Sequence, residues 1–399
     1  MNGGVYLFAK FKRKKFTAWL LTLMMILTFI APVNAFAVES DEINLQILAT
    51  SDLHGRFMPY DYAVNASDTS GSMVQLQTII RGLKDENPNT ILVDNGDTVQ
   101  DNSSALFNND SVHPMVFAMN EMGYDTWSYG NHEFNYGIPT LQKIASQFTG
   151  TALCGNVFDS DGKSLGESYK IIEKDGVKIA IIGMVNPHIT KWDGPNLAGY
   201  TVTNPVEETK KVINELNKLV GEDKVDVMIA TLHAGLEEEY GTGDSARELA
   251  IACPELTAIV AGHAHSSIPE VKVGNVIITE PKNGGAELSK IDIKVTEDAD
   301  GNYSVVDGKS VVISAKGGVA DEELSDKLQT YHERAIADAN VVIGELKGGD
   351  LVPADEIKGI PAAQVKDTAM IDLINKVQMF YGNANIASAA AFKSDANIK

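Results

Sequence analysis

Short, almost continuously apolar runs that alternate with amphipathic segments are the feature that most constrains the fold of this chain. The apolar runs are rich in β-branched residues and lie at residues 43–50, 90–93, 178–185, 225–232, 256–261 and 276–279. Such runs are typical of strands that are buried on both faces of a sheet. Between them, residues 72–87 and 206–220 carry apolar side chains at the i, i+3, i+4 spacing of a helix with one buried face. The alternation predicts an α/β core built in layers.

Side chains of the types that bind metal ions gather at five points where an apolar run ends. The five segments are Asp52-Leu53-His54, Asp94-Asn95-Gly96-Asp97, Gly130-Asn131-His132-Glu133, Leu232-His233-Ala234-Gly235 and Gly262-His263-Ala264-His265. Residues two apart on an extended segment point to the same face, as Asp52 and His54 would. The functional crevice of an open α/β sheet lies outside the carboxyl ends of its strands. We therefore expect the five segments to build one site.

A single residue of these types has an ordinary structural explanation. An Asp after a strand is usually a turn former, and a lone His is usually solvated or satisfied within the core. Here, however, five of the eight histidines fall in the five segments, and His113, His188 and His332 lie elsewhere. We interpret those three as structural or surface residues. Glycines flank the candidate ligands, and glycine permits the sharp turns and close backbone approach that a crowded site needs.

The donor set indicates two metal ions. Imidazole, carboxylate and one amide oxygen, without a cysteine, suit Zn, Mn, Fe or Co better than a structural cysteine-type zinc site. Seven candidate ligands are too many for one ion once water is counted, whereas two ions that share a bridging carboxylate would use them all. Two ions about 3.5–4 Å apart would create hydroxide at neutral pH and hold a phosphoryl group. The predicted cofactors are thus two divalent transition-metal ions.

The charge of the chain restricts its partners. It carries 33 Lys and Arg against 54 Asp and Glu, a formal net charge of −21. This balance argues against a protein that binds a nucleic acid polymer through a broad basic face. A phosphate-bearing substrate would need another source of positive charge, which bound metal ions would supply.

The N-terminal segment has the pattern of an export signal. A basic cluster at residues 10–15 precedes an apolar run at 18–30 and the small-residue end Ala35-Phe36-Ala37. This predicts a signal peptide over residues 1–37 and an exported protein that is extracellular, cell wall-associated or periplasmic. The alternative is an uncleaved membrane anchor, although Pro32 and Asn34 interrupt the apolar stretch.

The two cysteines leave two interpretations open. Cys154 and Cys253 could pair in an oxidising compartment. Both flank strand-like runs, which favours the other interpretation, that they are small buried hydrophobic residues.

The alternation of apolar runs and amphipathic segments ends near residue 297. Residues 297–302 read as a polar hairpin turn, 321–339 as a mostly polar helix, 351–359 as irregular and 367–381 as an amphipathic helix. We expect a catalytic domain at 41–320, a linker helix at 321–340 and, at 341–399, the incomplete start of a second domain. About 60 residues make a weak domain alone.

The ordered set D-x-H, G-D, G-N-H-E, H-A-G and G-H-x-H resembles the calcineurin-like metallophosphoesterases. More narrowly, it resembles the secreted nucleotidases, which contain the 5′-nucleotidases/UDP-sugar hydrolases and the 2′,3′-cyclic-nucleotide 2′-phosphodiesterase/3′-nucleotidases. The resemblance covers residues 43–399 and implies a four-layer α/β/β/α sandwich, followed here by the start of a second α/β domain.

The resemblance also implies a role for each matching residue. Asp52, His54 and His265 would bind one ion, Asn131, His233 and His263 would bind the other, and Asp97 would bridge the two. His132 would be catalytic, because it would stabilise the phosphoryl transition state or protonate the leaving oxygen. The resemblance would place the nucleobase contacts beyond Lys399, and it therefore implies no particular substrate-binding residue within this chain.

One position departs from the 5′-nucleotidase pattern N-H-E-F-D. Here the run reads Asn131-His132-Glu133-Phe134-Asn135. We include Asn135 with His132 in the predicted catalytic pair, but an amide cannot hold an imidazolium as a carboxylate does, so the acid strength of His132 should differ. The simpler alternative is that Asn135 only orients the ring. Residues 52–62, 93–102, 192–197 and 372–381 also resemble the cyclic-phosphodiesterase branch, which we favour.

The leading hypothesis is therefore an exported phosphoesterase with two metal ions. It would hydrolyse 2′,3′-cyclic nucleotides and 3′-nucleotides to nucleoside and phosphate through attack by metal-bound hydroxide. A second hypothesis is a 5′-nucleotidase or UDP-sugar hydrolase. A third, of another class, is a non-catalytic surface binding protein that retains the fold, which the presence of all seven candidate ligands disfavours.

Overall fold

The computed structural model describes residues 42–345 and 347–389 of the chain. They belong to two compact units, which divide between Ala335 and Ile336. The predicted signal peptide lies outside the described residues. The domain boundaries expected from the sequence, 41–320, 321–340 and 341–399, stay a prediction.

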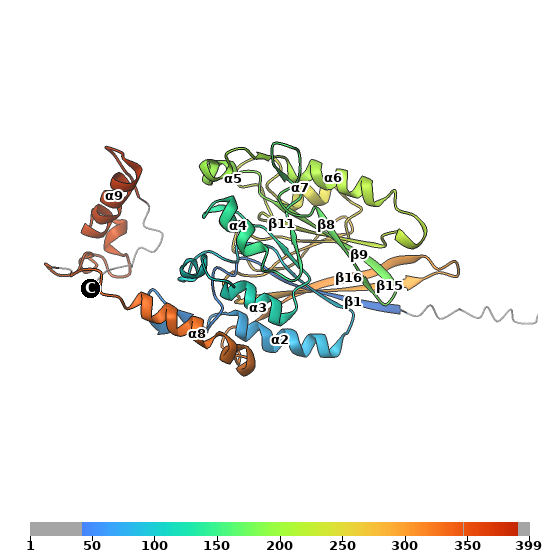
Figure 1. Ribbon diagram of the computed structural model, residues 1–399, viewed down its shortest axis with the longest axis horizontal. Helices are drawn as coiled ribbons and strands as arrows, with labels where there is room; N and C mark the ends of the chain where they lie inside the picture. The colour runs from blue at the N-terminus through green and yellow to red at the C-terminus, as the bar shows by residue number, and fades with distance from the viewer. Residues whose placement is uncertain (1–41, 346, 390–399) are drawn as a thin grey trace, which may run out of the picture. The chain divides into compact units, whose positions relative to one another are not determined.

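The first unit contains two six-stranded sheets (Figure 1). The first sheet has the order β16-β15-β1-β4-β5-β6. Its strands are β1 (Glu42–Thr50), β4 (Thr90–Asp94), β5 (Thr126–Ser128), β6 (Thr151–Leu153), β15 (Glu287–Glu297) and β16 (Tyr303–Ser314). β1, β4, β5 and β6 are parallel, whereas β15 and β16 add antiparallel strands at one edge. The turn predicted at 297–302 joins these two strands.

The second sheet repeats this plan with the order β13-β14-β12-β11-β9-β8. Its strands are β8 (Tyr169–Lys174), β9 (Val177–Val185), β11 (Val227–His233), β12 (Ala258–Val260), β13 (Ile268–Val273) and β14 (Val276–Glu280). β9, β11, β12 and β14 are parallel, and the two outer strands are antiparallel to their neighbours. Each sheet thus has four parallel strands whose carboxyl ends lie at one edge.

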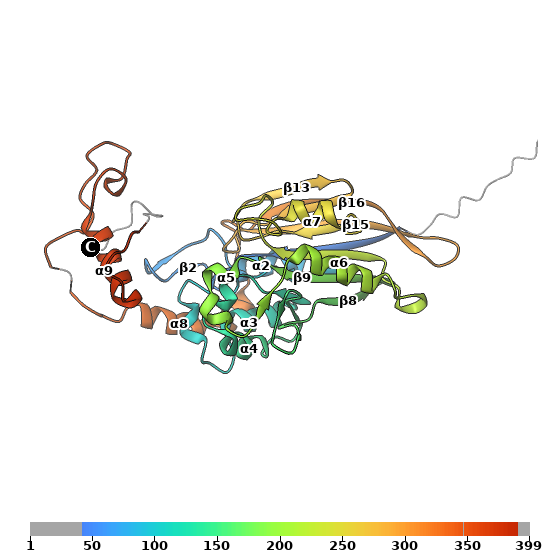
Figure 2. The same cartoon turned by 90° about the horizontal axis from the view of Figure 1, so that it is seen from above.

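The two sheets pack face to face. Ile47 and Ile91 of the first sheet share one buried cluster with Ile181 and Ile229 of the second. Helices cover the outer faces: α2 (Met73–Glu86) and α3 (Pro114–Met122) lie on the first sheet, and α6 (Pro205–Leu216) and α7 (Ala246–Ala252) on the second (Figures 1 and 2). This arrangement confirms the predicted four-layer α/β/β/α sandwich.

Shorter elements complete the unit. They are the pairs β2 (Tyr60–Asp61) with β3 (Ala66–Ser67) and β7 (Val157–Phe158) with β10 (Thr201–Val202), the helices α4 (Ile138–Ala145) and α5 (Ile189–Trp192), and the 3₁₀ turns η1 (Ser104–Phe107), η2 (His132–Phe134), η3 (Gly194–Leu197) and η4 (Gly221–Asp223). The loops that carry the candidate ligands run between these elements and the sheet edges.

The two helices predicted within the sandwich are present, and one of them is shorter than expected. α2 begins after its N-cap Ser72 and ends before Asn87, as predicted. α6 was expected to reach Val220 but ends at Leu216, with Asn217 as its C-cap. Val220 is 77% exposed and therefore does not belong to the buried face. That apolar residue made the sequence pattern look longer than the helix.

The helix predicted at 321–339 is α8 (Glu322–Ala339), which buries Leu324, Leu328 and Ala335. In the second unit, the helix predicted at 367–381 is α9 (Ala369–Gly382), preceded by the short turn η5 (Ala362–Gln364). Thr368 caps α9 by accepting a hydrogen bond from the Ile371 backbone N–H. Across the part of the chain that the structure describes, none of the helices has the length and apolar character to cross a membrane.

Both cysteines are buried and free. Cys154 follows β6, and Cys253 is the C-cap of α7, where it belongs to the apolar cluster between that helix and the second sheet. The structure therefore supports the interpretation of Cys253 as a small buried hydrophobic residue and does not contain the alternative disulfide.

Candidate metal centre

The five ligand-bearing segments meet at one edge of the sandwich. Three of them follow β1, β4 and β5 of the first sheet, and two follow β11 and β12 of the second. Because the parallel strands of each sheet end at the same edge, the loops that follow them come together. The structure thus brings all seven predicted ligands into one region, although they span residues 52 to 265 of the sequence.

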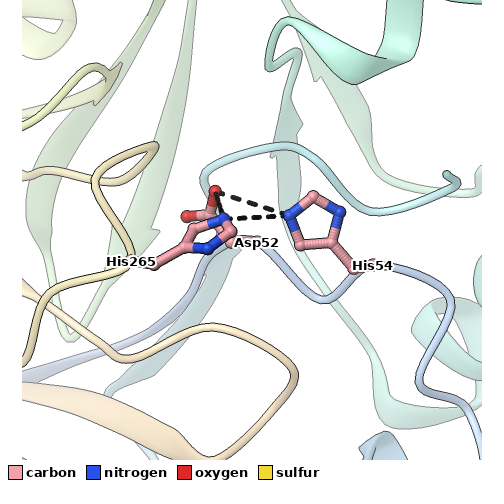
Figure 3. Close-up of side chains that lie close together, drawn as sticks. All are labelled: Asp52, His54 and His265. Carbon is pink, nitrogen blue, oxygen red and sulfur yellow. Dashed lines mark hydrogen bonds and ion pairs between the residues drawn. The ribbon is translucent and has the colours of Figure 1, made fainter. Parts of the chain in front are cut away.

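The first group consists of Asp52, His54 and His265 (Figure 3). Nε2 of His54 lies 3.0 Å from Nε2 of His265. Oδ1 of Asp52 lies 3.3 Å from Nε2 of His265 and 4.0 Å from Nε2 of His54. Three potential donors from two distant loops therefore converge on one point, as the ligands of a single cation would.

The second group consists of Asp97, His233 and His263. Nε2 of His233 lies 3.1 Å from Oδ2 of Asp97 and 3.2 Å from Oδ1 of Asn131. The same Nε2 is 3.9 Å from Oδ1 of Asp52, so the two groups adjoin. Asn131, which the sequence placed with this second group, thus contributes its amide oxygen beside the other donors.

Five of the seven side chains project from backbone in the left-handed region. The φ angles are 54° at Asp52, 46° at His54, 55° at Asp97, 69° at His263 and 54° at His265. A residue other than glycine adopts this region at a cost, and such residues cluster at functional sites where surrounding structure holds them. Strand ends that turn sharply in this way direct several side chains toward the same point.

Two glycines make the close packing of these loops possible. A Cβ atom added at Gly130 would lie 2.3 Å from Oδ1 of Asp97 and 2.7 Å from Cε1 of His233. A Cβ at Gly262 would lie 2.2 Å from Oγ of Ser51 and 3.0 Å from Oδ2 of Asp52. These contacts confirm that glycine beside the ligands serves close approach.

Neighbouring groups orient the ligand rings. Nδ1 of His233 lies 2.6 Å from the carbonyl oxygen of Asn95, and Nδ1 of His54 lies 3.3 Å from Oε1 of Gln100. Each partner is an acceptor, so each ring holds its proton on Nδ1 when neutral and leaves Nε2 free to bind a cation. The sequence analysis identified neither of these roles, although Asn95 belongs to the quoted run Asp94–Asp97.

Glu133 is a third residue whose role the sequence did not show, although it belongs to the quoted run Gly130–Glu133. Its buried carboxylate accepts hydrogen bonds from the backbone N–H groups of Asp97, Thr98 and Gly130, each at 2.7 Å. It therefore fastens the loop after β4 to the loop after β5. The available sequence signal was its position directly after His132 in that run.

Charges in the centre are strongly coupled. Burial favours neutral groups, but the charge of His233 holds the pKa of Asp97 well below its usual range. Burial likewise opposes a charged His233, yet the carboxylates of Asp97 and Asp52 raise its pKa to about 10. Burial and the charge of His233 lower the pKa of His263 to about 4. A proton thus occupies a position where a cation is favourable, and a bound metal ion would displace it.

The donor chemistry fits divalent metal ions. Imidazole nitrogens, two carboxylates and one amide oxygen converge, and both carboxylates are fully buried among potential ligands rather than exposed to water. Sets of this kind suit transition metals such as zinc, manganese, iron or cobalt. The chain therefore has two possible metal-binding groups that share one edge of the fold.

His132, the predicted catalytic residue, lies beside the metal-binding groups. Its Nε2 is 4.0 Å from Oδ2 of Asp97, and its ring centroid is 5.4 Å from that of His54. The backbone N–H of His132 donates a hydrogen bond to Oδ1 of Asp97 at 2.7 Å. Nδ1, on the other side of the ring, lies 2.7 Å from Oδ1 of Asn135. Asn135 therefore contacts His132 as the sequence suggested.

Aromatic side chains flank the second group. Trp192 of α5 stacks on His263, with ring centroids 5.1 Å apart, and meets Tyr240 edge to face at 5.2 Å. Tyr240 lies on a loop whose backbone N–H groups at Tyr240 and Gly241 donate to the buried Asp244 carboxylate. Trp192 and Tyr240 are 36% and 49% exposed, so they form an aromatic rim beside the donors.

The three remaining histidines lie outside the centre. His113 is buried and caps α3. His188 lies 3.5 Å from a carboxylate oxygen of Asp244, and Nδ1 of His332 lies 2.8 Å from the hydroxyl of Tyr62. None of the three belongs to either metal-binding group of the described residues.

Comparison with known protein families gives one decisive match. Residues 45–267, more than half of the chain, match the model of the calcineurin-like phosphoesterases. The chain belongs to the calcineurin-like phosphoesterase family. The matched region contains the seven predicted ligands together with His132 and Asn135, and the family resemblance inferred from the five motifs is confirmed.

Two relatives and one solved structure illustrate the similarity of this calcineurin-like phosphoesterase to known proteins. It is 28% identical over 91% of its length to the trifunctional nucleotide phosphoesterase protein YfkN of Bacillus subtilis. It is 26% identical over 89% of its length to the 2′,3′-cyclic-nucleotide 2′-phosphodiesterase/3′-nucleotidase of Salmonella typhimurium. A crystal structure of the calcineurin-like phosphoesterase YfkN from Bacillus subtilis matches with a TM-score of 0.69 and 28% identity, covering 75% of this chain and 99% of the other.

The alignments span only part of each curated relative. The chain covers 27% of the Bacillus protein and 59% of the Salmonella protein. The alignments thus include most of this chain, whereas the relatives contain further regions outside the alignments.

Proposed function

We propose that the chain is a metal-dependent phosphoesterase that hydrolyses 2′,3′-cyclic nucleotides and 3′-nucleotides to nucleoside and phosphate. The observation that carries this proposal is the convergence of seven nitrogen and oxygen donors on two adjoining groups at one edge of the sandwich. Family membership supports phosphate ester chemistry, and the names of the two relatives support a nucleotide substrate.

The residues would divide the work as follows. Asp52, His54 and His265 would bind one ion and Asn131, His233 and His263 the other, with Asp97 between them. Bound divalent ions would supply Lewis acidity toward the phosphoryl oxygens and lower the pKa of water. His132, whose Nε2 faces the centre, would stabilise the transition state or protonate the leaving oxygen. The ions would be of the zinc, manganese, iron or cobalt class.

The proposal includes export, on the pattern of residues 1–37. The acidic chain would then meet nucleotides outside the cytoplasm, where their hydrolysis releases nucleoside and phosphate for uptake. It binds no nucleic acid polymer in this proposal, and the membrane or cell wall is a partner only through export or anchoring.

The test combines metal analysis with substrate preference. The purified chain is expected to contain about two transition-metal ions, as a dinuclear phosphoesterase requires. A chelator should abolish hydrolysis of 2′,3′-cyclic AMP and 3′-AMP, and added Mn²⁺, Zn²⁺ or Co²⁺ should restore it. Both substrates should be turned over faster than 5′-AMP.

The alternatives give different results in the same experiment. Hydrolysis of 5′-AMP or a UDP-sugar alone would identify a 5′-nucleotidase or UDP-sugar hydrolase instead. Absence of bound metal after gentle purification, together with no hydrolysis after metal is added, would favour a binding protein that retains the fold.

A further inference from the structure

His132, Asn135 and Asp193 form a continuous row of hydrogen-bonded side chains. Nδ1 of His132 lies 2.7 Å from Oδ1 of Asn135, and Nδ2 of Asn135 donates to Oδ2 of Asp193 at 3.0 Å. Asp193 lies 58 residues beyond Asn135 in the sequence, directly after α5. It is 7% exposed, so its carboxylate is held in the protein interior behind the amide.

The chemistry of the row determines where its protons lie. An ionised carboxylate only accepts hydrogen bonds, so the amide group of Asn135 must turn its NH₂ toward Asp193. Its oxygen then faces His132, and Nδ1 of that ring must carry a proton to donate. Nε2 of the neutral ring is left with its lone pair on the side of Asp97 and His54.

We propose that Asp193 is a positioning residue which, through Asn135, holds His132 in the Nδ1–H form with Nε2 directed at the metal-binding groups. This inference rests on the proposed phosphoesterase function for its kinetic consequence but not for the proton arrangement itself. Asp193 supplies from a separate loop the carboxylate that the pattern N-H-E-F-D has at the position of Asn135.

The loop of Asp193 is fastened to the turn that bears His132. Nδ2 of Asn196 donates to the carbonyl oxygens of Phe134 and Asn135, at 3.0 and 3.1 Å, and lies 3.2 Å from Oδ1 of Asp193. These bonds fix the distance between the carboxylate and the amide. The row is therefore a built feature of the fold and not an accidental contact of exposed side chains.

Exchanging the amide at position 135 with the carboxylate at position 193 tests the proposal. Asp193→Asn removes the charge and lets the Asn135 amide turn either way. Asn135→Asp places a second carboxylate next to Asp193. The double variant Asn135→Asp/Asp193→Asn lets the new carboxylate at position 135 accept directly from His132 and be held by the new amide at position 193. It should recover what each single variant loses.

The first measurement needs no catalytic activity. Histidine-labelled ¹⁵N spectra of the full chain loaded with Zn²⁺ distinguish a ring nitrogen that carries a proton from one that does not, and His132→Gln assigns the signals. At a pH at which the ring is neutral, we expect His132 to be protonated on Nδ1 in the native chain and the double variant, and to be a mixture of both forms in Asp193→Asn. Protonation on Nε2 in the native chain would overturn the proposal.

The second measurement compares leaving groups. A ribose oxygen needs a proton to leave, which Nε2 of His132 would take up from water and pass on while Nδ1 keeps its own proton, whereas p-nitrophenolate leaves readily without one. Because general acid catalysis contributes about 10²–10⁴-fold, Asp193→Asn should lower kcat for 3′-AMP by roughly tenfold or more while kcat for p-nitrophenyl phosphate changes little. The exposed Asp161→Asn is the matched control and should change neither.

The outcomes separate a positioning role from general damage and from failure of the proposed function. Equal losses of kcat on both substrates in Asp193→Asn, or no recovery in the double variant, would contradict the proposal. If the native chain cleaves neither ester, the proposed function fails, and the ¹⁵N spectra still decide whether the row sets the proton on His132.

Discussion

Asp97 joins the parts of the candidate centre at the scale of single atoms. Its Oδ2 lies 3.1 Å from Nε2 of His233, and its Oδ1 accepts the backbone N–H of His132. Its own backbone N–H donates to Glu133. One side chain therefore contacts the second metal-binding group and the loop of the catalytic candidate, which fits its proposed place between the two ions.

Replacement of Asp97 by Asn is expected to remove the dinuclear centre. The amide keeps the size of the side chain but loses the negative charge that faces His233. Replacing an outer partner of a metal ligand already lowers metal affinity or activity by about 10–100-fold. Loss of the charge of Asp97 itself should therefore lower turnover by at least about 100-fold. Metal analysis and hydrolysis of p-nitrophenyl phosphate measure the two effects.

The control for this variant is Asp161→Asn, which removes an exposed carboxylate away from the centre. It should keep the metal content and turnover of the native chain. Similar losses in both variants would contradict the assignment of Asp97.

His113 gives a residue-scale prediction about stability. Its Nδ1 accepts from the Met115 backbone N–H, and its Nε2 lies 3.1 Å from the carbonyl oxygen of Ser104. Burial lowers its pKa from 6.5 to about 4, and a proton on Nδ1 would also break the cap of α3. The unfolded chain therefore binds this proton more readily, and stability falls as the pH drops from about 6.5 toward 4. Above that window the contribution of His113 is constant.

The expected size is about 2 kcal/mol of unfolding free energy between pH 7 and pH 5. Urea unfolding at both values should show this loss in the native chain. His113→Asn keeps an acceptor for the helix cap but does not titrate, so its stability should change less over the same interval. An identical pH dependence in both proteins would show that His113 is not responsible.

At the scale of elements, the two sheets approach closely beneath the centre. A Cβ atom added to Gly183 of β9 would lie 2.3 Å from Cβ of Leu153 and 2.7 Å from Oγ of Ser128, both in the first sheet. The hydroxyls of Ser128 and Thr231 join the sheets by a buried hydrogen bond of 2.6 Å. The relative position of the two strand edges, and with it the position of the ligands, depends on this contact.

Gly183→Ala should therefore destabilise the chain, by about 1–3 kcal/mol for an overpacked core. The matched control is Gly82→Ala on the exposed side of α2, where an added Cβ meets nothing within 4 Å. There alanine should stabilise by about 0.5–1 kcal/mol, because glycine is unfavourable within a helix. Thermal and urea unfolding measure the change in stability of each variant. A neutral Gly183→Ala would mean that the sheets can separate without cost.

At the scale of the whole molecule, the candidate metal centre lies in the first unit. All seven candidate ligands, His132 and Asp193 lie before the division between Ala335 and Ile336. The nucleoside contacts are expected outside this unit. Contacts remote from the reacting atoms contribute binding energy that can raise both affinity and turnover.

A chain that ends after Ala339, at the end of α8, should therefore keep its metal ions and its rate on p-nitrophenyl phosphate. It should distinguish adenine from uracil nucleotides no better than the 399-residue chain does. Metal analysis and specificity constants for both substrate types, measured beside the 399-residue chain, provide the comparison. Loss of metal from the shortened chain would show that the second unit contributes to the centre.

Much of the architecture followed from local patterns. Buried strands such as β1 and β9 are nearly continuous apolar runs. For α2, the sequence shows both the spacing of the buried apolar residues and the N-cap residue Ser72. Metal-ligand residue types after successive strands predicted a common site, because parallel strands of one sheet end at one edge. Val220, in contrast, extended the apolar pattern of α6 beyond the helix, since pattern alone does not show which residues reach the core.

The sequence by itself determined the buried strands β1, β4, β9, β11, β12 and β14, the helices α2, α6, α8 and α9, and the candidate ligands with His132, because these depend on residue type and on near neighbours along the chain. Only the tertiary structure decided which loops meet across the two sheets. It placed Glu133 on the backbone of another loop, Gln100 behind His54, and Asp193 behind Asn135 across 58 positions. Such partners are joined by packing and by hydrogen bonds between distant segments, and no local periodicity encodes them.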